Sequence, residues 1–203
     1  MSRVSHWLFG VSLVAAFLGV PTRAEGAEEE PSLEIFGFVG PSLTAGDPAV
    51  PETTESFRRV GIYGELGVAF RSRYFLDPFF SVGYGSLASA DTELADGPWG
   101  AGGTLSQRLD TWLLSPGVTS EFWRLRLRLG LGLAIVVQHY EFRGDEHGTT
   151  QFPIAAQLGL GFELYDSPRF RLDVEGRFVH AGGAGISFGV LGVTARGDLL
   201  VFH

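Results

Sequence analysis

Residues 125–138 read LRLRLGLGLAIVVQ, and this stretch decides the fold. Its odd positions are all large and apolar, from Leu125 to Val137. Its even positions read Arg126, Arg128, Gly130, Gly132, Ala134, Val136 and Gln138. A period of two is typical of a β-strand, since successive side chains of a strand point to opposite faces. At about 3.3 Å per residue the apolar stripe is about 40 Å long, which is enough for a tilted crossing of a bilayer. The stretch therefore predicts a membrane-spanning strand with one lipid-facing side.

The same alternation recurs along the chain. Together with less regular apolar segments it predicts about eight strands, over residues 33–44, 59–70, 80–85, 105–122, 125–138, 151–164, 170–178 and 186–202. The predicted connections alternate between short ones, at 71–74, 123–124 and 166–169, and longer polar or glycine-rich ones, at 45–56, 88–104 and 141–150. Transmembrane barrels have this asymmetry, with short periplasmic turns and long outer loops.

A sheet in hydrocarbon must have no open edge, because lipid offers no partner to an unpaired N–H or C=O group. We therefore predict an all-β fold, an eight-stranded antiparallel transmembrane β-barrel in an outer membrane. Such a barrel is just wide enough to be filled by its own side chains. The charged residues expected to point inward are Arg59, Glu65, Arg126, Arg128, Glu163, Arg171, Asp173, Glu175 and Arg177.

Two further expectations concern the wall of the barrel. Aromatic girdles at the membrane interfaces are expected from Tyr74, Phe75, Trp123, Tyr140, Phe142 and Tyr165. The alternative fold is a soluble barrel of the lipocalin type, in which the apolar faces would point inward around a ligand. The two folds differ in the side of the sheet that carries the leucine stripe.

The N-terminus has the features of a secretory signal peptide. A positive charge at Arg3 precedes an apolar run from Trp7 to Val20, and Thr22-Arg23-Ala24 follows the small-x-small cleavage pattern. We expect residues 1–24 to be the signal peptide and residues 25–203 to be the barrel, with a cut near Ala27 or a buried N-terminal helix as the alternatives. The mature chain then has 13 arginines and 23 acidic residues, a formal net charge of −10.

Composition excludes several classes of function. The chain has no cysteine, and all 15 of its basic residues are arginine, so thiolate chemistry, disulfides and a Walker-type phosphate loop are excluded. An acidic chain has no basic field to neutralise phosphates, which argues against a nucleic-acid partner. We expect no cofactor and no metal, although Glu141, Asp145, Glu146 and His147 offer a divalent-cation site as the alternative to a solvated acidic loop.

His180 is the residue most suggestive of chemistry, because strand parity places an ionisable side chain on the lipid-facing wall near an outer loop. Around it, several stretches resemble in order and spacing the lipid A 3-O-deacylase (acyloxyacyl hydrolase-like) family of outer-membrane barrels. They are Phe75-Leu76-Asp77-Pro78-Phe79, Gly83-Tyr84-Gly85, Gly148-Thr149, Phe152, Gln157-Leu158-Gly159-Leu160-Gly161, Arg177-Phe178-Val179-His180-Ala181-Gly182-Gly183-Ala184-Gly185 and Leu191-Gly192-Val193-Thr194.

The resemblance implies a barrel that meets lipid A at its outer wall. The family motif is His-x-Ser-Asn-Ala-Gly, with the His as general base for the Ser, but here Gly182 stands at the nucleophile position and Gly183 at the Asn position. We therefore expect a barrel without the hydrolase activity, acting as a structural or lipopolysaccharide-binding protein, with His180, Gly182 and Gly183 as its lipid site.

Other functions remain open. One is an active deacylase in which His180 is catalytic and Ser187 replaces the missing nucleophile, although seven residues and a turn separate the two. Another is a small adhesion or stability barrel that acts through its long loops. The expected partners are outer-membrane lipid, lipopolysaccharide and the barrel assembly machinery, and the sequence leaves the oligomeric state open.

Overall fold

The computed structural model describes residues 31–45, 60–72, 76–94, 102–167 and 169–201. The predicted signal peptide, the loop at 45–56 beyond residue 45, and Arg59, Tyr74 and Phe75 lie outside these residues. Within them, no helix is long and apolar enough to cross a membrane.

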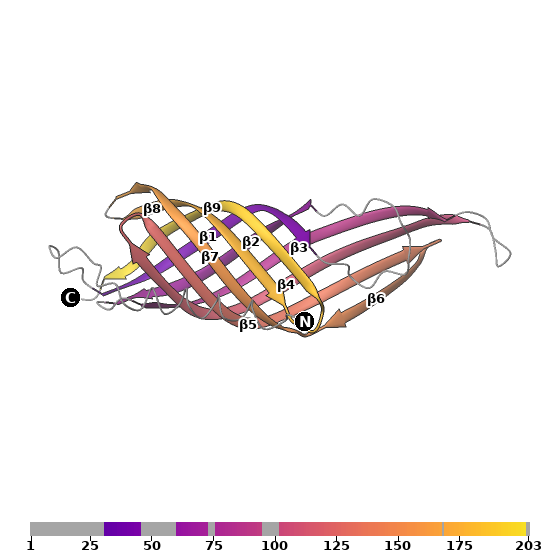
Figure 1. Cartoon of the computed structure of the whole chain (residues 1–203), viewed down its shortest axis with the longest axis horizontal. Helices are drawn as coiled ribbons and strands as arrows, with labels where there is room; N and C mark the ends of the chain where they lie inside the picture. The colour runs from indigo at the N-terminus through magenta and orange to yellow at the C-terminus, as the bar shows by residue number, and fades with distance from the viewer. Residues whose placement is uncertain (1–30, 46–59, 73–75, 95–101, 168, 202–203) are drawn as a thin grey trace, which may run out of the picture.

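The described residues form an antiparallel sheet that closes on itself (Figure 1). Its strands are β1 (Ser32–Ala45), β2 (Val60–Arg71), β3 (Asp77–Leu94), β4 (Gly103–Phe122), β5 (Leu125–Phe142), β6 (Asp145–Gln151), β7 (Ile154–Asp166), β8 (Phe170–Ala181) and β9 (Ile186–Val201). Each strand pairs with the next along the chain, except that β7 pairs with β5 and not with β6, and β1 pairs with β9 to close the barrel. Because β6 and β7 lie along the same edge of β5, with only Phe152 and Pro153 between them, the barrel has the eight strands that the sequence predicts.

Two of the predicted outer loops are wrong. The segment 141–150 is a hairpin in which β5 continues to Phe142 and turns through Arg143 (φ 56°) and Gly144 (φ 83°) into β6. Two successive residues with positive φ make the type I′ turn that suits tightly connected strands. In the segment 88–104, residues 88–94 belong to β3 and residues 103–104 to β4, while residues 95–101 lie outside the described ones. These parts of the strands project beyond the lipid-facing wall, so they need no apolar face. The alternation of apolar and polar residues therefore stops although the strands continue.

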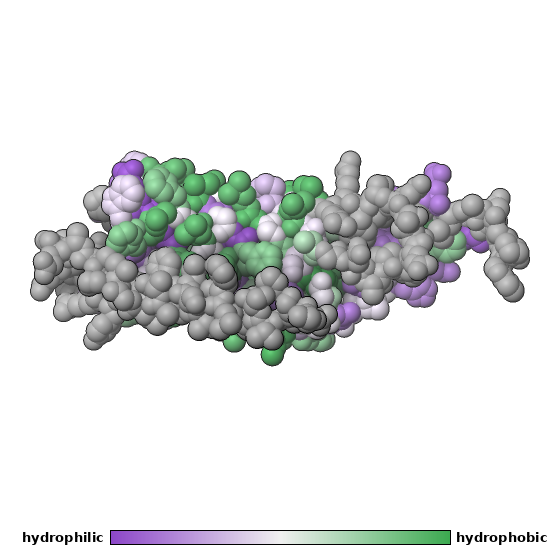
Figure 2. All heavy atoms as spheres, in the orientation of Figure 1, coloured by the Kyte–Doolittle hydropathy of each residue, from purple (hydrophilic) through white to green (hydrophobic). Residues whose placement is uncertain are grey.

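The leucine stripe faces outward. Leu131 is 64% exposed, whereas its near neighbour Arg128 on the same strand is fully buried. Figure 2 shows hydrophobic side chains over the barrel and hydrophilic ones toward the end where β3, β4, β5 and β6 project. The lipocalin alternative is therefore wrong, since it requires the opposite orientation of every strand.

Aromatic side chains lie at strand ends, as expected of interfacial girdles. At the turn between β4 and β5, Trp123 is 79% exposed and packs edge-on against Phe162, while Tyr165 packs against Phe170. The pairing of Tyr84 with Trp112 toward the other end is not anticipated by the sequence reading. Tyr140 and Phe142, which are expected in a girdle, lie on the extended hairpin opposite His147 and Asp145 of β6.

The lumen is filled in two layers. The layer toward the projecting strands is apolar, and its buried members include Phe38, Tyr63, Leu109, Val136, Val179, Ile186 and Phe188. The layer toward the short turns is ionic, and its members include Glu34, Glu65, Glu121, Arg126, Arg128, Asp173, Glu175, Arg177 and Arg196. The predicted inward charges are thus confirmed where they are described, and Glu34, Glu121 and Arg196 join them.

Ion pairs hold the ionic layer together. Glu65 accepts from Arg128 at 2.5 Å and lies 2.8 Å from Arg177, which in turn pairs with Glu175 at 2.9 Å. The Arg128 guanidinium also lies 4.2 Å from the ring centre of Phe36. Buried charges are tolerated when they are paired and hydrogen-bonded in this way.

Candidate functional site on the outer wall

His180 lies one residue before the end of β8, and its side chain is exposed on the outer wall as strand parity predicts. Its partner is Ser187 of β9, whose Oγ is 2.8 Å from His180 Nδ1. The seven residues and the turn between them in the sequence do not keep the two side chains apart. A turn at 182–185 joins two antiparallel strands, and the register then sets His180 directly opposite Ser187.

The glycines of the motif lie in this turn and not on the strand. The Gly182 N–H donates to the carbonyl of Ile154 at 2.9 Å, and Gly183 has a φ of +86°, which favours glycine. A Cβ at Gly182 would meet its nearest atom, the Ile154 carbonyl oxygen, at 3.6 Å. The position of the family nucleophile therefore has room for a side chain, although none is present.

A catalytic triad needs a third group that orients the imidazole. Within the described part of the chain, no ion pair or hydrogen bond joins a carboxylate to His180. Asp198 is the one acidic residue that follows His180 in the sequence. It lies near the other end of β9, where its carboxylate accepts a hydrogen bond from Ser32 at 3.3 Å. His180 and Ser187 are thus a dyad without this orienting group.

An open apolar groove of about 580 Å³ lies along the outer wall below the dyad. Phe178 lies opposite Gly189, and Gly176 lies opposite Leu191, in the two outward-facing rows that follow His180 and Ser187. The glycines form the floor, because they carry no side chain on this face. The side chains that rise around it are Pro41, Leu43, Val60, Leu158, Leu160, Phe178 and Leu191.

The glycine floor is open space and not a site of close backbone contact. A Cβ at Gly176 would come no closer than 4.0 Å to another atom, and one at Gly189 no closer than 3.8 Å. The sequence alone does not predict this groove. Gly176 and Gly189 interrupt otherwise apolar outward positions, but only the register between β8 and β9 shows that they lie on neighbouring rows.

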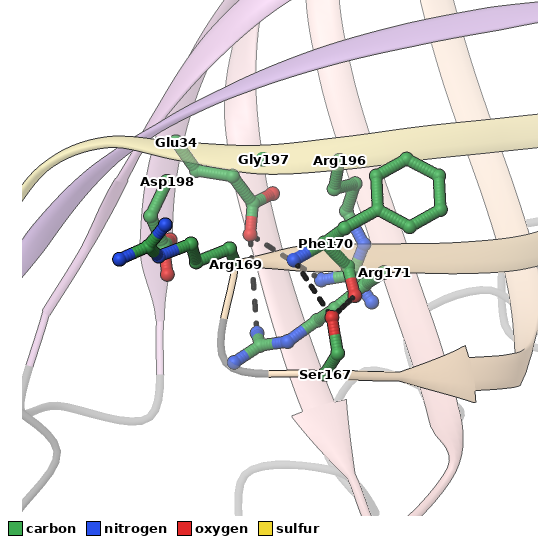
Figure 3. Close-up of a pocket in the computed structure, with 8 residues that line it drawn as sticks. All are labelled: Glu34, Ser167, Arg169, Phe170, Arg171, Arg196, Gly197 and Asp198. Atoms are coloured by element: carbon green, nitrogen blue, oxygen red, sulfur yellow. Dashed lines mark hydrogen bonds and ion pairs between the residues drawn. The ribbon is translucent and has the colours of Figure 1, made fainter.

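Two other charged clusters lie among the described residues. Figure 3 shows a small pocket near the short turns in which Arg171 and Arg196 already face Glu34, at 3.9 and 3.5 Å. In the projecting hairpin, the acidic residues considered for a cation lie on β5 and β6. No group of three potential metal ligands occurs among the described residues.

Comparison with known proteins identifies the architecture. No family model and no curated protein matches the chain. Among solved structures, Neisserial surface protein A (NspA) matches with a TM-score of 0.55 at 12% identity, covering 84% of this chain and all of that one. Ail, the attachment invasion locus protein of Yersinia pestis, in complex with the heparin analogue sucrose octasulfate, matches with a TM-score of 0.53 at 14% identity, covering 83% and 99%.

The chain is an outer-membrane β-barrel. Both the fold shared with these proteins and the apolar outer wall carry this conclusion. The comparisons do not show the lipid A 3-O-deacylase family, and membership of it stays a prediction from the motif around His180.

Proposed function

We propose that this outer-membrane barrel binds an acyl chain of lipopolysaccharide in the groove below His180 and Ser187, and that it lacks the hydrolase activity of the deacylase family. The observation that carries the proposal is the glycine-floored apolar groove on the lipid-facing wall. It begins one row below two polar side chains that can hydrogen-bond to an ester or a sugar hydroxyl.

Burial of apolar surface is a weak driving force here, because an acyl chain leaves other acyl chains when it enters the groove. Association within lipid depends instead on packing, which is why membrane interfaces use small residues that permit close approach. Gly176 and Gly189 provide this approach, and Phe178, Leu158 and Leu191 provide the flanking contacts. The dyad then fixes the polar end of the lipid at the top of the groove.

Filling the groove tests the proposal. Gly176→Leu occupies the floor without a backbone clash, and Gly64→Leu adds the same side chain to another outward position of the wall, where the nearest atom to a new Cβ is 3.6 Å away. Lipopolysaccharide that remains bound through detergent purification is measured by mass spectrometry. We expect the first variant to retain several-fold less than the wild type and the second to retain as much. Equal retention by both variants would contradict the proposal.

Ester hydrolysis is the second candidate, favoured by the 2.8 Å contact between His180 and Ser187. In this reaction His180 takes the hydroxyl proton of Ser187, the Ser187 oxygen attacks the ester carbonyl of a membrane lipid, and the alcohol leaves with the proton. Water then hydrolyses the acyl-serine. The dyad has no orienting carboxylate among the described residues, and loss of triad members removes most of a triad's rate.

Lipid A analysis separates the two candidates. We expect cells that contain the wild type or Ser187→Ala to have the same acyl pattern, and Gly182→Ser to be the variant that can gain activity, because it restores the family nucleophile beside His180. Loss of an acyl chain with the wild type that disappears in Ser187→Ala would establish the hydrolase instead.

Adhesion like that of an attachment protein remains a third proposal. The Ail structure contains a polyanion, a heparin analogue. The described part of the projecting sheet carries Asp91, Glu93, Glu141, Asp145 and Glu146, which would repel such a ligand. A polyanion is therefore not the ligand that we propose for this chain.

A further inference from the structure

Among the residues that the structure describes, β6 has an open edge. β8 ends at Ala181, which pairs with Ala155 of β7, and above that point the chain turns back into β9. Within the described residues, β6 pairs with β5 alone, and Figure 1 shows it at the margin of the molecule. All seven residues of β6 are exposed. At about 3.4 Å per residue the open edge is about 24 Å long.

The turn determines which residues present hydrogen-bonding groups to this edge. A two-residue turn closes on a hydrogen-bonded pair, here Phe142 and Asp145, and bonded and non-bonded pairs alternate along an antiparallel ladder. The N–H and C=O groups of Asp145 therefore point toward β5. Those of Glu146, Gly148 and Thr150 point away from β5, toward the open side.

The cross-strand row that begins at Glu146 is acidic, whereas the row two positions further along the strands contains Arg108, which pairs with Asp110. Glu146 lies directly opposite Glu141, and the same cross-strand row continues through Ser106 to Asp91. Like charges at directly opposed positions destabilise a sheet. A basic side chain on an added strand would relieve this repulsion, whereas an acidic one would increase it.

We propose that the open edge of β6 is a docking site for an extended basic segment of a partner protein, which adds as a further strand. Strand addition takes affinity from main-chain hydrogen bonds and selectivity from alternate side chains. The main-chain groups here are those of Glu146, Gly148 and Thr150, and selectivity comes from the acidic row. The same acidic residues protect the edge from pairing with acidic or apolar strands. This site is separate from the lipid groove on the wall.

A peptide binding experiment tests the proposal with the full-length folded barrel in detergent. The probe is a labelled eight-residue peptide of alternating arginine and threonine, and the control probe has glutamate in place of arginine. Thr150→Pro removes an N–H on the open side and leaves the β5 ladder intact, whereas Thr150→Val keeps it. We expect saturable binding of the basic peptide, about tenfold weaker binding to Thr150→Pro, and unchanged binding to Thr150→Val.

Two further readouts keep the test independent of folding. Hydrogen exchange of the wild type should show that the peptide protects the amides of Glu146 and Thr150 more than those of Asp145 and His147, which already face β5. Glu146→Arg should weaken binding of the basic peptide. Equal binding of both peptides, equal binding by the proline and valine variants, or no change in exchange would overturn the proposal.

Discussion

Arg128→Met is the substitution that examines the ionic layer most directly. Arg128 is fully buried, pairs with Glu65 at 2.5 Å, and approaches Glu175 at 3.8 Å. Its guanidinium lies between the rings of Phe36 and Phe79, at 4.2 Å from each centre. Methionine has a similar shape but no charge, so the variant removes the ion pairs and the ring contacts while it keeps most of the packing.

The expected loss follows from these contacts. Removal of one partner of a buried ion pair costs about 3–5 kcal/mol, because the other charge is left uncompensated. Loss of the desolvated ring contacts adds about 1–2 kcal/mol. Glu65 keeps Arg177 at 2.8 Å and the amide of Gln157 at 3.0 Å, which limits the penalty. We therefore expect the free energy of unfolding to fall by about 4 kcal/mol.

Urea unfolding of the barrel in detergent or lipid, followed by tryptophan fluorescence and heat-modifiable migration, measures this change. Glu65→Gln combined with Arg128→Met should be less destabilised than the sum of the single variants, with a coupling of about 2 kcal/mol. Arg108→Met is the control, since Arg108 is half exposed and donates to Asp110 and to the Tyr84 hydroxyl. An exposed pair of this kind contributes about 1 kcal/mol or less. A loss below about 1 kcal/mol for Arg128→Met, or no coupling with Glu65, would refute the reasoning.

Three other predictions concern the fold. Gly132→Ala would set a Cβ 1.9 Å from the Leu114 carbonyl oxygen, so heat-modifiable migration should show little folded barrel, whereas Gly189→Ala, with 3.8 Å of space, should fold as the wild type does. Equal folding of the Gly132→Ala and Gly189→Ala variants would contradict the close approach of Gly132 to the Leu114 carbonyl. Arg143→Asn should slow hydrogen exchange in the β5–β6 hairpin by stabilising it by about 0.5 kcal/mol, because asparagine tolerates the φ of 56° better; faster exchange would contradict this. Planar bilayer recordings should show no stepwise conductance, since apolar and ionic layers fill the lumen, and steady channel steps would contradict the packed interior.

The sequence predicts the barrel because the residue types of a membrane-spanning strand have to alternate strictly. Lipid on one side and a packed lumen on the other require opposite residue types at alternate positions, as at Leu131 and Arg128. The same logic, carried to β1 and β9, would have identified Glu34 and Arg196 as inward charges. The hairpin of β5 and β6 could not be predicted in this way, because both of its faces meet water and its residue types need not alternate.

The candidate site was harder to predict for a different reason. His180 could be placed by parity on its own strand, but its contact with Ser187 depends on the register between two strands and on the turn at 182–185. The groove depends on the same register, because Gly176 and Gly189 come from different strands. Pairing across strands is set by the closed sheet as a whole and not by any short stretch of residues.

The two-layered lumen also constrains how the protein enters the membrane. Arg128 meets its carboxylate partners, Glu65 and Glu175, only across strands that are far apart from it in the chain. The β4–β5 hairpin inserted on its own would carry the Arg128 guanidinium into hydrocarbon without either of these carboxylates. Membrane insertion and barrel closure therefore have to proceed together. Until β9 can pair with β1, the chain has to stay in water or bound to the barrel assembly machinery.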